Sequence, residues 1–166
     1  MKALRVVVIL AAFVVAALVV YRYVLQPRFQ AADTITVYYS EIDGATLVPW
    51  KVSLGPDRSR KSVAAYALAQ VLVGPPSQVE AIRFPAGTVT RGVTLDGSTL
   101  VADLGGTIAG SVGGSFAEAG EFKALVWTMT ALPDIKAVQI EIDGRKVATL
   151  PGGHLELDQP LARSNF

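Results

Sequence analysis

Hydrophobic residues dominate the first 25 positions of the chain, and no polar face interrupts them. The stretch from Val6 to Tyr21 has no charged residue, and the apolar run ends at Leu25. At about 1.5 Å per residue, a helix of this length crosses most or all of a hydrocarbon core about 30 Å thick. We therefore predict a transmembrane helix from Val6 to Leu25, since a helix that is apolar all round has no polar face to expose.

A cleaved signal peptide is the alternative for this segment, and it requires small residues just before the cleavage site. Two alanines end the following linker, but Phe29 or Gln30 stands at the third position back, which makes a poor site. We expect an uncleaved anchor. The basic residues before the span, Lys2 and Arg5, favour a cytoplasmic N-terminus and a C-terminal domain outside the cytoplasm.

Beyond the linker, the pattern changes to short β-rich runs around three Asp-Gly pairs. The pairs are Asp43-Gly44, Asp96-Gly97 and Asp143-Gly144. Apolar and polar residues alternate in runs such as AVQIEI, as they do in a strand with one buried face. Asp-Gly accepts positive φ at both central positions of a type I′ turn, so the pattern predicts three β-hairpins.

Two helical patterns separate these predicted hairpins. The first, SVAAYALAQVLVG, stops at Gly74, and Pro75 cannot continue it. The second begins at Ser115, which forms the capping-box pattern S-x-x-E with Glu118. The apolar stripe of each helix is expected at Ala64, Leu68, Val71 and Leu72, and at Phe122, Leu125, Val126 and Met129.

The order of hairpins and helices predicts an α+β fold, with a mostly antiparallel sheet and two amphipathic helices. We assign residues 1–32 to the membrane anchor and linker, and residues 33–166 to a single folded domain. This domain has no cysteine and hence no disulfide, but it is long enough to bury a core without one.

The net charge of +1 conceals an acidic domain behind a basic N-terminus. Four of the 15 basic residues precede Asp33, which leaves 11 Lys and Arg against 14 Asp and Glu in the domain. These basic residues are scattered, whereas a nucleic-acid partner requires a basic stripe. We therefore expect no nucleic-acid binding.

Candidate catalytic groups are few. The one histidine, His154, lies in a turn-rich tail, and without cysteine or clustered carboxylates we expect no metal site and no cofactor. Asp103 interrupts an apolar strand and is the best single candidate for a catalytic carboxylate, but such an acid more often caps or turns a strand end. The glycine-rich stretch before Ser115 lacks the lysine and the spacing of a phosphate-binding loop. We predict no catalytic residues.

Aromatic residues offer an alternative function, the binding of cell-wall glycan or peptide. Tyr38 and Tyr39 are adjacent in a predicted strand, so their side chains face opposite sides. We expect one to be buried and one exposed, and we expect Trp50 and Trp127 to be packed.

The ordered set of motifs resembles the GerMN domain family, named after a sporulation and spore-germination protein of endospore-forming bacteria. The stretches are TVYYSEIDGATLVPWKV, LAQVLVGPP, FPAGTVTRGVTLDGSTLVADLG, LVWTMTALPDIKAVQIEIDGRKV and PGGHLELDQPLAR. The family-motif residues, which we expect to be structural, are Leu47, Val48, Pro49, Gly74, Pro75, Pro85, Gly87, Thr88, Asp103, Asp143 and Gly144.

This resemblance implies a non-catalytic α+β module outside the bacterial cytoplasmic membrane, akin to ring-building motifs. Relatives are commonly anchored through a lipidated cysteine, whereas this chain has no cysteine and carries a transmembrane-like span instead. We expect an interaction or assembly module of an envelope, sporulation or germination complex. Its expected partners are the membrane, other envelope or sporulation proteins and a second copy of itself, with peptidoglycan as the alternative.

Overall fold

The computed structural model describes residues 13–19, 34–110 and 115–166. Its contacts divide the chain into two units, Met1–Asp33 and Thr34–Phe166. In the first unit, residues 13–19 are helical with exposed side chains, and the rest of the predicted span from Val6 to Leu25 lies outside the described residues. None of the helices in the described ranges is long and apolar enough to cross a membrane.

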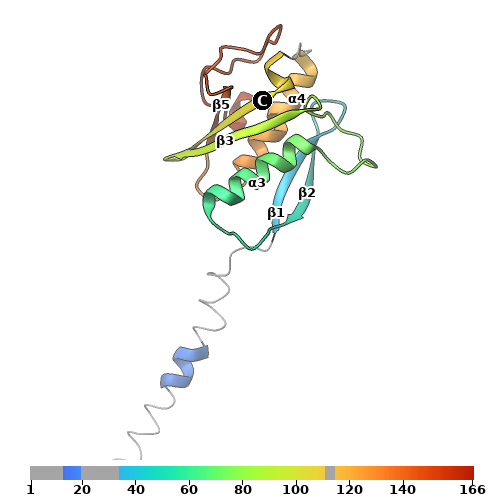
Figure 1. Ribbon diagram of the computed structural model, residues 1–166. Helices are drawn as coiled ribbons and strands as arrows, with labels where there is room; N and C mark the ends of the chain where they lie inside the picture. The colour runs from blue at the N-terminus through green and yellow to red at the C-terminus, as the bar shows by residue number, and fades with distance from the viewer. Residues whose placement is uncertain (1–12, 20–33, 111–114) are drawn as a thin grey trace, which may run out of the picture. The chain divides into compact units, whose positions relative to one another are not determined.

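The second unit has an α+β fold, as the sequence predicted (Figure 1). Its elements are β1 (Thr34–Ser40), β2 (Leu47–Ser53), α3 (Arg60–Val73), β3 (Thr88–Asp96), β4 (Thr99–Gly106), the 3-10 helix η2 (Thr107–Gly110), α4 (Ser115–Met129), β5 (Ala137–Ile142) and the 3-10 helix η3 (Arg163–Asn165). The strands form two sheets, β1-β2 and β3-β4-β5, where a single sheet was expected.

The first sheet is an antiparallel pair whose connecting loop contains Asp43-Gly44. The Asp43 carboxylate accepts hydrogen bonds from the backbone N–H groups of Ala45 (2.9 Å) and Thr46 (2.8 Å), and from the Thr46 hydroxyl (2.6 Å). The Thr46 hydroxyl and these N–H groups lower the pKa of Asp43. Residues 41–46 therefore form a longer loop stabilised by an aspartate side chain, not the two-residue type I′ turn that was predicted.

The second sheet combines an antiparallel and a parallel pair. The two-residue loop Gly97-Ser98 joins β3 to β4, and only Gly97 of the two adopts a positive φ (58°), so this turn also differs from type I′ and has the aspartate before its central positions. β5 pairs with β4 in parallel, with α4 in the connection between them. The prediction of a mostly antiparallel sheet is wrong for this pair.

The third Asp-Gly pair forms the predicted turn but not a hairpin of two strands. Asp143 (φ 51°) and Gly144 (φ 74°) both adopt positive φ, and the backbones of Ile142 and Arg145 exchange hydrogen bonds across them. No return strand follows, because the outer edge of β5 is occupied farther along by Leu161.

α3 begins at the N-cap Ser59, whose side chain accepts a hydrogen bond from the backbone N–H of Ser62. It ends at Gly74, which has a positive φ of 82°. The helix packs against β1, β3 and α4 (Figure 1). Its buried residues are Ala64, Ala67, Leu68 and Val71, so the predicted stripe is confirmed except for Leu72, which is half-buried.

α4 provides the centre of the core. The predicted stripe of Phe122, Leu125, Val126 and Met129 is completely buried. Phe122 packs edge-to-face on Phe84, with ring centroids 5.7 Å apart. Burial extends from this stripe to β1, β4 and β5, so both sheets share one core.

Candidate functional site

The apolar face of β2 is less covered than that of β1. Val37 of β1 is fully buried, whereas its cross-strand partner Trp50 keeps 38% of its surface exposed. Paired residues share a face of the sheet, so Trp50 points to the same side as Val37. Among the described elements, β2 packs closely only with β1. Trp50 and Val52 therefore line an open apolar groove between β2 and α3.

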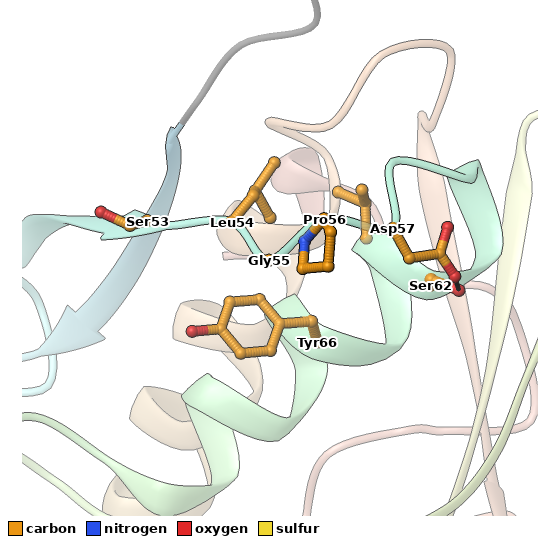
Figure 2. Close-up of a pocket in the computed structure, with 8 residues that line it drawn as sticks. Ser53, Leu54, Gly55, Pro56, Asp57, Ser62 and Tyr66 are labelled. Carbon is orange, nitrogen blue, oxygen red and sulfur yellow. Dashed lines mark hydrogen bonds between the residues drawn. The ribbon is translucent and has the colours of Figure 1, made fainter.

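The groove consists of two hollows that share Ser53. The first hollow, of about 450 Å³, is lined by Ser53, Leu54, Gly55, Pro56, Asp57, Ser62, Val63 and Tyr66. Figure 2 shows the Tyr66 ring on the α3 side, opposite Leu54 and Pro56. The second hollow, of about 420 Å³, is lined by Tyr39, Trp50, Lys51, Val52, Ser53, Gln70, Val73, Gly74, Pro75 and Pro76.

A rigid polar corner closes the first hollow at the start of α3. The Asp57 carboxylate accepts a hydrogen bond from the Ser62 hydroxyl (2.6 Å; Figure 2) and one from the Ser59 N–H (2.9 Å). The bond from Ser62 is the main cause that lowers the pKa of Asp57. Because this carboxylate is already bonded to its own helix, it serves the fold and leaves the groove mainly apolar.

The second hollow presents apolar side chains to solvent. Val73 is 74% exposed, beside Trp50 and the two prolines that follow α3. Tyr39 forms the buried floor and its hydroxyl donates a hydrogen bond to the Gln70 carbonyl (3.3 Å), while burial raises its pKa. The exposed apolar side chains of this hollow suit contact with a partner's apolar side chains, and Lys51, Ser53 and Gln70 add polar groups to its lining.

The two edges of the first sheet are protected in different ways. On β1, the Tyr38 N–H donates to the Thr128 hydroxyl (2.8 Å) and the Ser40 carbonyl accepts from the Ile82 N–H (2.8 Å). Because the backbone groups of Tyr38 point away from β2, the backbone of its cross-strand partner Pro49 points toward the outer edge of β2. Pro49 has no N–H to donate, and an exposed lysine follows two residues later, so this edge is a poor template for another strand.

The second sheet also has protected edges. β3 carries a bulge at Arg91, where the register shifts between Thr90 and Gly92. The outer edge of β5 is covered by Leu161, whose backbone exchanges two hydrogen bonds of 2.8 Å with Val138. These edges of the second sheet are therefore poor templates for pairing with another chain.

The model of the Germane family, described as sporulation and spore germination, matches residues 36–148. The chain belongs to this family. A search among curated protein sequences gave no significant match.

Solved structures with the same fold extend the Germane assignment to three dimensions. The tandem GerMN domains of the sporulation protein GerM from Bacillus subtilis match with a TM-score of 0.63 and 22% identity, over 80% of this chain and 46% of that one. Its first GerMN domain alone gives 0.63 and 21%, over 80% and 99%. A predicted lipoprotein from Clostridium perfringens gives 0.58 and 16%, over 82% and 94%. The chain thus spans about half of the tandem structure, and at these identities the likeness shows the fold.

The motif residues of the Germane domain lie at corners and edges of the fold. Leu47, Val48 and Pro49 open β2 beside the groove. Gly74 donates its N–H to the carbonyls of Gln70 and Val71 (both 3.2 Å) and thereby ends α3. The buried Pro75 then turns the chain away, so the break at Gly74-Pro75 is a structural corner next to the second hollow.

A second corner leads into β3. The Pro85 carbonyl accepts hydrogen bonds from the Thr88 N–H (3.0 Å) and hydroxyl (2.7 Å). Gly87 adopts a positive φ of 91° between them. These bonds account for the Pro-Ala-Gly-Thr motif without a ligand.

Asp103 joins β4 to the turn after β5. Its carboxylate accepts a hydrogen bond from the Gly144 N–H (2.8 Å) and lies 3.7 Å from the Arg91 guanidinium, which also reaches Asp143 (3.4 Å). Three of the family-motif residues therefore meet, at a bonded turn. This arrangement explains the aspartate in an apolar strand.

Sequence reasoning missed a pair of buried glutamates on α4. Glu118 is 1% exposed and Glu121 is 9% exposed. Glu118 was predicted to cap the helix with Ser115, whose side chain lies outside the described part. Its carboxylate instead accepts a hydrogen bond from the backbone N–H of His154 (3.0 Å). The only available signal was the position of Glu118 one turn before Phe122, on the apolar stripe.

The remaining candidates do not assemble a catalytic or metal site. His154 is exposed, and its backbone N–H, not its ring, makes the contact with Glu118. In residues 13–19, 34–110 and 115–166, no group of three His, Cys, Asp or Glu residues is placed to hold a metal ion. The glycine-rich stretch ends β4 and forms η2, and residues 111–114 lie outside the description.

The tyrosine pair matches the prediction for the buried member but not for an exposed one, and one tryptophan differs. Tyr39 is buried and Tyr38 half-buried, on opposite faces of β1. Trp127 is packed between Lys123 and Arg163, which lie 5.7 and 5.5 Å from its ring centroid. Trp50, expected to be packed, is exposed in the groove.

Proposed function

We propose that this Germane domain is a non-catalytic interaction module of a bacterial envelope, sporulation or germination complex. The N-terminal segment anchors it in the cytoplasmic membrane, and the domain works outside the cytoplasm. The single observation that carries the proposal is the apolar groove between β2 and α3. Its exposed Trp50 and Val73 offer a partner protein a hydrophobic anchor point.

Membrane anchoring strengthens such a contact. Confinement raises the effective concentration of two partners, so a modest apolar interface suffices for assembly. Relatives described as a sporulation protein and a predicted lipoprotein support an extracytoplasmic setting. A second copy of the chain and a different envelope protein are both compatible partners for the groove.

Site-specific photocrosslinking in living cells tests the groove. A photoreactive residue replaces Val73 in the full-length chain, and the matched control replaces Val89, an exposed valine on β3 outside both hollows. We expect discrete adducts from position 73, weaker after Trp50→Ala, and none from position 89. An adduct at twice the mass of the chain identifies a second copy. Equal adducts at both positions would refute the groove as the contact surface.

Two further measurements separate the parts of the proposal. Protease added to intact spheroplasts should remove an epitope fused after Phe166; full protection would contradict the orientation. The detergent-solubilised chain should stay in the supernatant with insoluble peptidoglycan. Pelleting that Trp50→Ala abolishes would favour the wall-binding alternative, with the exposed Trp50 as its aromatic platform.

A further inference from the structure

The first half of α4 buries two carboxyl groups on the same side of the helix. Glu118 and Glu121 are three residues apart, and residues at this spacing are neighbours on a helix surface. An ionised carboxylate in such a place is costly unless it is paired or hydrogen-bonded. The salt bridges found among the described residues involve neither glutamate.

Glu118 holds the loop of residues 151–154 against the helix. One of its oxygens, Oε2, accepts the hydrogen bond from the His154 N–H (3.0 Å), while the other, Oε1, is buried without a hydrogen-bond partner. A Cβ at Gly153 would overlap this carboxylate, so the loop seats because residue 153 has no side chain. The loop therefore lies close to the Glu118 carboxylate, but it donates a hydrogen bond to only one of the two carboxylate oxygens.

Glu121 holds its proton more tightly than an ordinary glutamate. Burial raises its pKa to about 7, and the charge of Glu118 adds to the effect. The other ionisable side chains on α4, on the elements packed against it and on the adjoining segments are Tyr38, Tyr39, Glu41, Arg60, Lys61, Tyr66, Glu80, Arg83, Lys123, Glu141, His154, Glu156 and Arg163. Of all these neighbours, only Glu118 shifts the pKa of Glu121, so no cation offsets a second negative charge.

We propose that the Glu118–Glu121 pair is a proton-operated latch for the loop of residues 151–154. With a proton on Glu121, no second negative charge lies beside the Glu118 carboxylate, which keeps the loop docked through the His154 N–H. Loss of that proton places two negative charges together in a site without a counter-ion. The repulsion is reduced when the loop leaves α4 and water reaches the Glu118 carboxylate. This inference is independent of the groove and of its partner.

The direction of the pH effect follows from the pKa of Glu121, which is raised from 4.5 to about 7. Between these values the folded domain binds a proton that the unfolded chain has released. The folding equilibrium constant therefore falls as pH rises through this window, by at most about tenfold per pH unit. Acidification favours the docked loop, and neutral to alkaline conditions favour its release.

Amide NMR of the Asp33–Phe166 fragment tests the latch, since Thr34–Phe166 is a compact unit with its own core. His154→Asn serves as the background, because it removes the imidazole titration and keeps the backbone N–H. We expect the residue-154 amide shift to titrate with a midpoint near 7. Its hydrogen-exchange protection factor should fall about tenfold or more from pH 5.5 to 8.5.

Two substitutions and a control decide the result. Glu121→Gln should flatten the titration and keep the loop protected at pH 8.5, while Glu156→Gln, at an exposed glutamate of the same tail, should change nothing. Glu118→Gln should lower the midpoint by removing the neighbouring charge. A Glu121→Gln protein that still titrates with the wild-type midpoint, or an amide that does not respond to pH, would overturn the latch. Should Glu121→Gln fail to fold, an unchanged midpoint in Glu118→Gln overturns it independently.

Discussion

Asp103 gives the sharpest test of whether the sequence motif is structural. Its carboxylate is 21% exposed and accepts the Gly144 N–H at 2.8 Å, so Asp103→Ala removes the acceptor that ties β4 to the turn after β5. Asp103→Asn keeps an acceptor oxygen for the Gly144 N–H, removes the charge and replaces the oxygen near Arg91 with an NH2 group. The pair of substitutions separates the hydrogen bond from the ion pair with Arg91.

The two contributions differ in size. A hydrogen bond to a charged group contributes about 1.5–3 kcal/mol. The Arg91 pair, at 3.7 Å and with 53% of the arginine side chain exposed, adds no more than about 1 kcal/mol because solvent screens it. We therefore expect Asp103→Ala to lower the free energy of unfolding by about 2–3 kcal/mol. Asp103→Asn should lose less than half of that amount.

Urea denaturation of the Asp33–Phe166 fragment, followed by circular dichroism, measures both changes. The slope of the transition should remain that of the wild type, because neither variant changes the area exposed on unfolding. A loss below about 0.5 kcal/mol in Asp103→Ala would show that the bond to Gly144 does not hold the turn. An Asn variant as unstable as the Ala variant would assign the effect to charge. A folded Asp103→Asn protein that has lost a measured activity would contradict the non-catalytic proposal.

Three further outcomes follow from contacts on α4. In Gly120→Ala, the new Cβ would lie 2.6 Å from Ile82 Cδ1. This overlap outweighs the gain in helix propensity, so thermal melts should show a destabilisation of about 1–3 kcal/mol. A stabilised variant would contradict this packing. Thr128→Val should cost about 1–3 kcal/mol and expose the Tyr38 amide to hydrogen exchange, because the N–H loses its acceptor, whereas Thr128→Ser should retain it. Because the pKa of Glu121 is raised to about 7, the free energy of unfolding of the wild-type domain should fall as the pH rises from 5.5 to 8. The whole fall above pH 4.5 is at most about 3 kcal/mol. An equal fall in Glu121→Gln would assign the pH dependence to another group.

Periodicity predicted the two helices and their stripes well, since Phe122, Leu125, Val126 and Met129 are all fully buried. It failed where a distant segment covers a polar position. Gln139 was expected on the polar face of its strand but is 2% exposed, because the tail packs over it and the Leu157 carbonyl accepts its side-chain N–H (2.9 Å). The alternation of apolar and polar residues along one strand does not show whether a distant segment packs over its polar face.

The groove could not be predicted for a related reason. Trp50 has the same sequence pattern as a buried strand residue, and its exposure depends on how far α3 and α4 extend across the sheet. Similarly, each Asp-Gly pair predicted a turn followed by an antiparallel partner strand. Tertiary packing, not the turn, decides which strand pairs with β5. Only Asp143-Gly144 adopts positive φ at both positions, and the strand beside it is β4.

The tail beyond the family match determines where the second sheet stops. The match ends at residue 148, yet Leu161 pairs with Val138 and fills the outer edge of β5. A chain cut before Leu161 would leave the outward N–H and C=O groups of Val138 unpaired, at the edge of a mainly apolar strand. Identical copies could then add strand to strand in one direction without closing, as in a fibre. Leu161 thus limits strand addition at this edge of the second sheet.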